Sequence, residues 1–163
     1  MTERILGHQW YYRADHLLIF LSYGSEIDTG MILEDAWHAG KMVYVPSVES
    51  GRMLFRRIDS LAQTQVGYRG IREPSRDAPV FQAAKEREKD TLMIMPGVAF
   101  AHERRRIGYG GGFYDRYLQD KPWLRTVAIG YKCQLLTEDS CGRFADDFPE
   151  EAWDIRPNQV ICL

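Results

Sequence analysis

Short apolar runs alternate with polar, glycine-containing segments along the first third of this chain. The run HLLIFLSY at 16–23 is too brief for a helix and predicts a buried strand. An amphipathic helix is expected next, beginning after an N-cap at Ser25 and ending at Gly40. Its apolar face is formed by residues at i, i+3, i+4 and i+7, namely Leu33, Ala36, Trp37 and Gly40. KMVYVP at 41–46 predicts a second strand, and the order strand, helix, strand favours a parallel crossover unit.

The same pattern returns in the second half of the chain. TLMIMP at 91–96 predicts a central buried strand that leads into a loop, a helix at about 113–119 and another strand at 126–131. Between the two units we expect a strand at 53–58 and a helix from Val80 to Glu88, separated by a loop rich in glycine and proline. QVICL at 159–163 predicts the last strand. The chain is therefore expected to be an α/β protein with a mainly parallel sheet.

Length, charge and cysteine content narrow the possible classes. With 163 residues, 45% of them apolar, one domain spanning 1–163 is expected. The net charge of −2 gives no general attraction to nucleic acid or to a membrane surface, and the apolar run at 17–21 is too short to cross a bilayer. We therefore expect no nucleic-acid or membrane partner. The protein is expected to be a monomer or a weak homodimer. The three cysteines, Cys133, Cys141 and Cys162, form no CxxC pair and favour a reduced, cytoplasmic setting.

The segment RIGYGGGFYDRYL at 106–118 is the strongest candidate for a functional site. It carries four glycines in five positions, Gly108, Gly110, Gly111 and Gly112, and begins at the end of a basic run, 104–106. Glycine permits left-handed backbone and the close approach of a ligand, and the following helix would direct free amides toward phosphate. The spacing differs from both the P-loop and the GxGxxG fingerprint. A glycine-rich turn that merely links strand to helix, with solvated arginines, would look similar.

Several motifs together resemble the 5-formyltetrahydrofolate cyclo-ligase family, also called 5,10-methenyltetrahydrofolate synthetase. They are PGVAF at 96–100, RIGYGGGFYDRYL at 106–118, EIDT at 26–29 and Glu73-Pro74. The long stretch alone is specific, because it is similar to the family signature PGxxFDxxGxRxGxGxGYYDxYL. The resemblance runs from about Tyr11 to the C-terminus. It implies a three-layer α/β sandwich similar to the ribose-5-phosphate isomerase and CoA-transferase group.

The resemblance also implies an activity, in which 5-formyltetrahydrofolate and ATP give 5,10-methenyltetrahydrofolate, ADP and phosphate. The ATP phosphates are then expected at Arg106, with Tyr114 as a second catalytic residue. The residues expected at the nucleotide are Arg106, Ile107, Gly108, Tyr109, Gly110, Gly111, Gly112, Phe113 and Tyr114.

The same resemblance assigns the metal and the folate to other residues. Asp115 and Asp154 are expected to hold Mg²⁺, while Leu21, Glu26 and Phe113 are expected to contact the folate. Each has a structural alternative: a first-turn helix acid for Asp115 and Glu26, a surface acid for Asp154, and packing for Leu21 and Phe113. Phe113 and Tyr114 could stack on the pterin or simply pack the helix. Gln134 matches a frequent glutamine of the family and is assigned no role.

Four positions depart from the family pattern: Ala101 replaces an aspartate, Arg104 a glycine, Phe113 a tyrosine and Asn158 an acid. Relatives also begin with an additional basic helix that reaches the ATP phosphates, so we expect those contacts to be missing from this sequence. These departures leave an alternative open, a non-catalytic relative that binds folate or nucleotide and has lost part of the ATP site.

Overall fold

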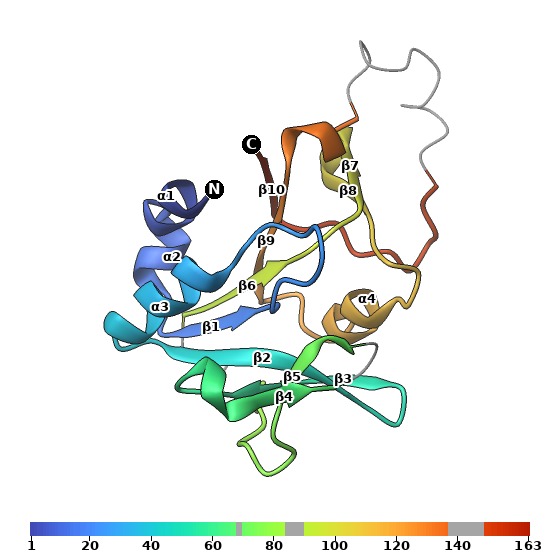
Figure 1. The fold of residues 1–163 in the computed structure, drawn as a ribbon. Helices are drawn as coiled ribbons and strands as arrows, with labels where there is room; N and C mark the ends of the chain where they lie inside the picture. Colours follow the sequence, from blue (N-terminus) through green and yellow to red (C-terminus); the bar gives the residue numbers. More distant parts are fainter. Residues whose placement is uncertain (68–69, 84–89, 137–148) are drawn as a thin grey trace.

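The computed structural model describes residues 1–67, 70–83, 90–136 and 149–163. Its centre is a six-stranded sheet with the order β10-β9-β6-β1-β2-β3 (Figure 1). Every neighbouring pair is parallel except β2 and β3, which are antiparallel. The predicted α/β class with a mainly parallel sheet is therefore confirmed.

The bounds of the elements are as follows. The helices are α1 (Thr2–Leu6), α2 (Gln9–Arg13), α3 (Gly30–His38) and α4 (Phe113–Leu118), with 3₁₀ turns η1 (Leu61–Gln63), η3 (His102–Arg104) and η4 (Lys132–Gln134). The sheet strands are β1 (His16–Ile19), β2 (Met42–Glu49), β3 (Arg52–Arg57), β6 (Thr91–Met95), β9 (Arg125–Gly130) and β10 (Gln159–Cys162). Two further pairs are β4 (Thr64–Val66) with β5 (Arg72–Pro74), and β7 (Ala99–Ala101) with β8 (Arg105–Ile107).

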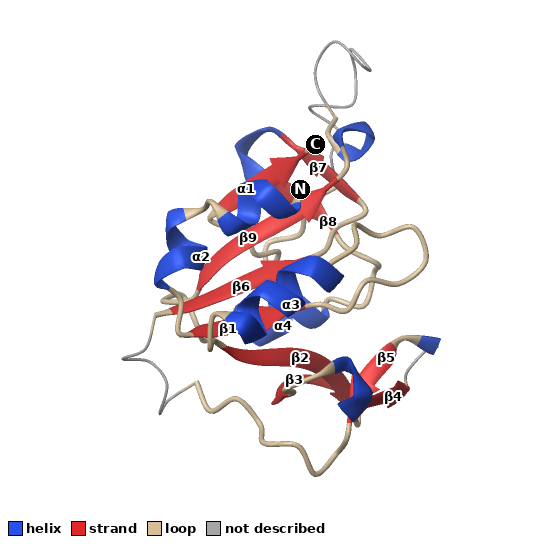
Figure 2. Cartoon of the chain, turned by 60° about the vertical axis from the view of Figure 1, so that its left-hand side comes forward, coloured by secondary structure: helices blue, strands red, loops and turns tan. Residues whose placement is uncertain are grey.

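Alternate residues of the central strands build a hydrophobic core on each face of the sheet. Leu17 and Ile19 of β1 join the cluster under α1, α2 and α3, whereas Leu18 joins the cluster that contains Leu118 of α4. This division follows from the two-residue period of a strand. The helices therefore cover both faces, giving the expected three layers; α1, α2 and α3 lie together and apart from α4 in Figure 1, and the turned view of Figure 2 brings them forward.

The first crossover unit forms as predicted, but its helix begins later. The N-cap of α3 is Thr29 and not Ser25. The reason is local, because Glu26 and Asp28 accept hydrogen bonds from the backbone amides of Tyr23 (2.9 Å) and Gly30 (2.8 Å). These side chains stabilise a loop before the helix, as acidic residues do near helix starts. Glu26 is thus a loop residue and not an acid of the first helical turn.

The prediction of a helix from Val80 to Glu88 is wrong for residues 80–83, the part that the structure describes. Val80 forms an isolated antiparallel bridge with Arg56, and the Phe81 amide donates to the carbonyl of Phe55 (2.8 Å). The buried Phe81 side chain and the open edge of β3 therefore hold this segment extended. Residues 84–89 of the predicted helix lie outside the described residues.

Candidate functional site

A cavity of about 730 Å³ opens beyond the carboxyl ends of β1 and β6, where ligands bind in open α/β sheets. Three segments form most of its wall: the loop after β1, the glycine loop before α4, and β2, β3 and β5 on the third side. The predicted residues on its wall are Leu21, Glu26, Arg106, Gly108, Tyr109, Gly110, Gly111, Gly112, Phe113, Tyr114 and Asp115. The fold thus brings together residues that are up to 94 positions apart, from Leu21 to Asp115.

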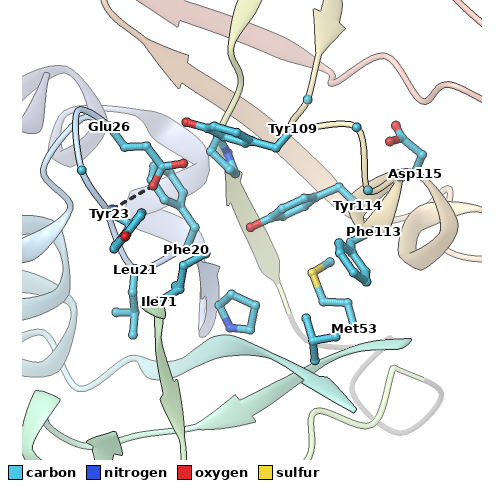
Figure 3. A pocket seen from close by; sticks show the side chains of 18 of the residues that line it. Phe20, Leu21, Tyr23, Glu26, Met53, Ile71, Tyr109, Phe113, Tyr114 and Asp115 are labelled. Carbon is cyan, nitrogen blue, oxygen red and sulfur yellow. Dashed lines mark hydrogen bonds between the residues drawn. The ribbon is translucent and has the colours of Figure 1, made fainter. Parts of the chain in front are cut away.

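The loop after β1 carries Glu26 into this cavity. Its carboxylate accepts hydrogen bonds from the Tyr23 amide and from the hydroxyl of Tyr109, which belongs to the glycine loop. Burial raises the pKa of Glu26 above its ordinary value, although both hydrogen bonds oppose the rise. Partial burial and the neighbouring carboxylate in turn raise the pKa of Tyr109 to about 12. Figure 3 shows the two side chains together on one side of the cavity.

Glycine is required in the segment 108–112 for two different geometric reasons. Gly110 and Gly112 adopt left-handed backbone, with φ of 79° and 58°, which other residues adopt only with strain. Gly108 allows close packing instead, because a Cβ there would lie 2.9 Å from Nη1 of Arg106. The loop is therefore shaped by its glycines and holds the arginine directly against its backbone.

The amides of Gly108–Gly112 donate no hydrogen bond to any other residue in the described part of the chain. This segment was predicted to be a loop, and it lies outside the strands. Arg106 and Ile107 differ from that prediction, because they belong to β8 and pair with Phe100 and Ala99 of β7. The Ile107 carbonyl accepts a hydrogen bond from the Val98 amide (2.8 Å), and Ile107 is not among the residues that line the cavity.

Arg106 is held by a buried ion pair with Asp115. Its Nη2 lies 3.0 and 3.2 Å from the two carboxylate oxygens, and the side chains are 4% and 12% exposed. Nη1 donates to the carbonyl of Pro96 (3.4 Å), while Nε is buried and has no partner among the described residues. The guanidinium group also lies 5.8 Å from the ring centre of Tyr114. The arginine is thus fixed in the cavity wall and retains one unsatisfied donor.

Only the last residue of the basic run 104–106 lines the cavity. Arg104 donates from Nη1 to the carbonyl of Asn158 (3.1 Å), and Arg105 donates from Nε to the carbonyl of His102 (3.3 Å). Arg104 adopts a φ of 63° at the position where the family signature has a glycine. This chain therefore forms left-handed backbone with an arginine at a position where glycine would adopt it without strain.

The aromatic pair at the start of α4 both lines the cavity and packs on the core. Phe113 and Tyr114 contact the cluster on the α4 face, and the Tyr114 ring lies 6.4 Å from that of Phe55. Burial raises the pKa of the Tyr114 hydroxyl well above its ordinary value, while the nearby Arg106 opposes the rise. In Figure 3 this hydroxyl points into the cavity toward the side that holds Glu26.

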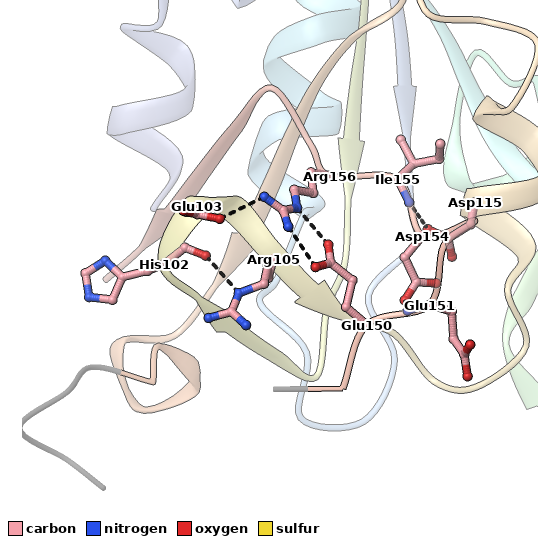
Figure 4. Close-up of polar contacts among 9 residues, drawn as sticks. All are labelled: His102, Glu103, Arg105, Asp115, Glu150, Glu151, Asp154, Ile155 and Arg156. Atoms are coloured by element: carbon pink, nitrogen blue, oxygen red, sulfur yellow. Dashed lines mark hydrogen bonds and ion pairs between the residues drawn. The ribbon is translucent and has the colours of Figure 1, made fainter. Parts of the chain in front are cut away.

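The segment 150–156 brings Asp154 close to α4 without placing it in the cavity wall. The Ile155 amide donates to Oδ1 of Asp115 (3.1 Å), which docks the segment on the helix (Figure 4). The Asp154 carboxylate accepts from the amide of Glu151 (2.9 Å). Within the described ranges, no group of three or more potential metal-ligating side chains occurs. Mg²⁺ needs only one or two carboxylates beside phosphate oxygens, so Asp115 and Asp154 are suited to it by donor type.

Two further residues, to which the sequence alone gave no role, shape this site. Gln134 of η4 donates from Nε2 to the carbonyls of Gly97 (2.8 Å) and Val98 (3.1 Å), and thereby ties β9 to the loop after β6. Glu73 of the EP motif lines the cavity and accepts from the amide of Val48 (3.2 Å), joining β5 to β2. Both were visible as family motifs, but their partners are distant in sequence.

Taken together, the fold and the cavity define an α/β protein in which the Glu26 carboxylate and a glycine-rich loop with unpaired amides line one cavity. The sequence profile of the 5-formyltetrahydrofolate cyclo-ligase family matches residues 1–162. The chain is 33% identical to the 5-formyltetrahydrofolate cyclo-ligase of Escherichia coli K12 over 91% of its own length and 78% of that protein. It is 27% identical to the cyclo-ligase of Mus musculus over 99% of its length and 79% of that protein.

Solved structures with related folds carry matching names. The structure of Aquifex aeolicus 5,10-methenyltetrahydrofolate synthetase superposes with a TM-score of 0.77 and 24% identity, covering 99% of this chain and 75% of that one. A Mycoplasma pneumoniae 5,10-methenyltetrahydrofolate synthetase gives a TM-score of 0.69 at 17% identity, covering 98% and 79%. This chain belongs to the 5-formyltetrahydrofolate cyclo-ligase family, as the resemblance of its motifs implied.

Proposed function

We propose that this protein is an enzyme that converts 5-formyltetrahydrofolate and ATP into 5,10-methenyltetrahydrofolate, ADP and phosphate. The observation that carries this proposal is the pairing in one cavity of Glu26 with a loop of free amides beside Arg106. Carboxylates recognise the N–H groups of a pterin, and free amides with an arginine recognise phosphate. The match to the family over residues 1–162 supports the same activity, and no comparison favours a non-catalytic relative.

The chemistry explains why two substrates must meet in one cavity. The carbon of a formamide is a poor electrophile, so its oxygen first attacks the γ-phosphorus of ATP and ADP leaves. N10 then attacks the activated carbon and loses its proton, and the oxygen departs with the phosphate. Such a transfer depends mainly on alignment and on neutralising charge.

The glycine loop and Arg106 would hold the phosphates. Free amides at 108–112 and the unsatisfied, buried Nε of Arg106 support this role. Tyr109, Phe113 and Tyr114 would complete the nucleotide contacts, with Ile107 contributing through the strand that supports the loop. In this proposal Arg106 acts at the phosphates while remaining oriented by Asp115, and Tyr114 orders the guanidinium by stacking against it.

The folate would occupy the other side of the cavity. Glu26 would accept hydrogen bonds from the pterin, Leu21 would pack against it, and Phe113 would contact the aminobenzoyl ring that follows the pterin. Tyr109 and the Tyr23 amide already hold the Glu26 carboxylate in place, so little ordering is needed when the pterin arrives.

Asp115 and Asp154 would hold Mg²⁺, whose contribution is to neutralise negative charge on the phosphates. The Ile155–Asp115 hydrogen bond, which brings their two segments together, supports this assignment. No helix in the described residues is long and apolar enough to cross a membrane. A cytoplasmic location and a monomer or weak homodimer, formed from a single domain, remain predictions from the sequence.

A spectrophotometric assay tests the proposed activity. Purified protein is mixed with 5-formyltetrahydrofolate, and formation of the conjugated methenyl product is followed with ATP and Mg²⁺ present, each withheld, or both withheld. The proposal expects product only when both are present. Binding of either substrate without any product would favour the non-catalytic relative instead.

A further inference from the structure

A second cavity, of about 710 Å³, adjoins the first one. Met53 and Phe113 line both cavities. In Figure 3 these two side chains lie across the first cavity from Glu26. A long ligand whose head is bound at Glu26 would therefore pass Phe113 and reach the second cavity.

The base of the second cavity is apolar and its rim is basic. Phe81, Ala83 and Tyr117 contribute apolar surface. Among the charged residues of this cavity, the positive charge of Lys121 is balanced by an ion pair with Asp120, and its Nζ also donates to the Tyr117 carbonyl. This leaves the two arginines of the rim, Arg52 at the start of β3 and Arg116 in α4.

Neither arginine has an acidic partner among the described residues. Arg116 places its guanidinium 5.2 Å from the ring centre of Phe113. Arg52 is exposed, and the acid opposite it in the sheet, Glu49, is instead paired with Arg56 (2.8 Å). The second cavity thus presents two positive charges that no described carboxylate balances. Arginine is the side chain best suited to bind carboxylates through paired hydrogen bonds.

We propose that the second cavity binds the glutamate portion of 5-formyltetrahydrofolate, with its two carboxylates at Arg52 and Arg116. This inference rests on the proposed function, because that substrate consists of a pterin, an aminobenzoyl ring and a glutamate in linear order. With the pterin at Glu26, the aminobenzoyl ring lies beside Phe113 and the glutamate enters the basic rim. Arg116, stacked on Phe113, is already positioned to meet the carboxylate nearest the ring.

Equilibrium binding of two ligands tests the proposal without requiring turnover. The ligands are 5-formyltetrahydrofolate and its diamide, in which both glutamate carboxylates are neutral amides. They are titrated into the parent protein and into Arg52→Gln, Arg116→Gln and the control Arg57→Gln. The control residue lies in the same strand as Arg52, is exposed, does not line either cavity and loses the same charge.

We expect the parent to bind the acid about tenfold more tightly than the diamide at low salt, as loss of charge-assisted contacts predicts. Arg52→Gln and Arg116→Gln should each weaken binding of the acid by about three- to tenfold and leave the diamide unchanged, while Arg57→Gln changes neither. Equal binding of acid and diamide by the parent would overturn the inference. So would variants that weaken both ligands equally, because that pattern reports a general change in folding or shape.

The same samples separate this inference from the proposed activity. If the parent prefers the acid and the arginine variants abolish the preference, but no methenyl product forms with ATP and Mg²⁺, the carboxylate subsite stands and the activity fails. If product forms but the variants bind the acid as the parent does, the activity stands and the subsite fails. If the parent binds neither ligand, both are overturned.

Discussion

Replacing Arg106 by lysine tests the buried pair that joins the glycine loop to α4. In the parent, one guanidinium group contacts both oxygens of Asp115, the carbonyl of Pro96 and the face of Tyr114. Lysine keeps the charge but has a compact ammonium, which cannot reach all three partners at once. The substitution should therefore lower both the stability of the folded protein and its affinity for ATP.

The expected magnitude follows from the number of contacts and their burial. Each hydrogen bond to a charged group contributes about 1.5–3 kcal/mol, and a buried pair responds in full because its side chains are 4% and 12% exposed. We expect Arg106→Lys to lower the free energy of unfolding by about 1.5–3 kcal/mol. For a chain of this size that corresponds to a fall in Tm of about 3–12 °C. ATP affinity should fall more than folate affinity.

The assay is a double-mutant cycle in urea unfolding, with ATP binding measured on the same proteins by calorimetry. Arg106→Lys, Asp115→Asn and the double variant are compared with the parent. A direct contact predicts that the second substitution costs much less when the first is present, with a coupling of about 0.5–3 kcal/mol. If the two single effects add to within about 0.5 kcal/mol, the pair does not contribute as described and the reasoning is refuted.

Four other predictions concern Glu26 and Gly110 in the cavity wall and Gln134, which braces the loop behind it. Glu26→Gln should weaken 5-formyltetrahydrofolate binding about tenfold or more in calorimetry, as expected for loss of charged hydrogen bonds. Because burial raises the folded-state pKa of Glu26, the parent should lose stability relative to this variant as pH rises from 4 through that pKa; a stability difference independent of pH would contradict this. Gly110→Ala should lower the free energy of unfolding by about 1–2 kcal/mol, because the φ of 79° is strained for alanine. Nothing lies within 4 Å of the added Cβ, so the loss would report backbone strain alone, and an unchanged Tm would refute it. Gln134→Ala should cost about 1–3 kcal/mol in urea unfolding by removing the donor to Gly97 and Val98, unlike a control substitution at the exposed Gln119, whose side chain makes no hydrogen bond to the described residues.

The features that could be predicted from the sequence are those with strong local causes. Continuous apolar runs predicted β1, β6 and β9 because a strand buried on both faces needs apolar residues at every position. The glycine loop and the start of α4 could also be predicted, since Gly110 and Gly112 permit the left-handed backbone of a tight turn before the helix. That loop was expected to follow a central strand, and the cavity opens at the carboxyl end of that strand.

The features that could not be predicted depend on distant partners or on very short elements. Helices α1 and α2 have five residues each, too few to show a helical period, and β7 and β8 have three each. The expected helix at 80–88 failed because Phe81 is buried beside β3, a partner that the local pattern does not reveal. From the sequence we expected Arg106 to contact the ATP phosphates and Asp115 to hold Mg²⁺. Only the fold shows that the two side chains form an ion pair with each other.

Isotope transfer from the substrate to phosphate tests the central claim most directly. 5-Formyltetrahydrofolate labelled with ¹⁸O in the formyl group is incubated with the protein, ATP and Mg²⁺, and the released phosphate is analysed by mass spectrometry alongside the methenyl product. If the cavity aligns the formyl oxygen with ATP at the glycine loop, each methenyl group formed should yield one ADP and one phosphate that carries the label. Methenyl product accompanied by unlabelled phosphate would contradict that alignment, and the absence of methenyl product would contradict the activity itself.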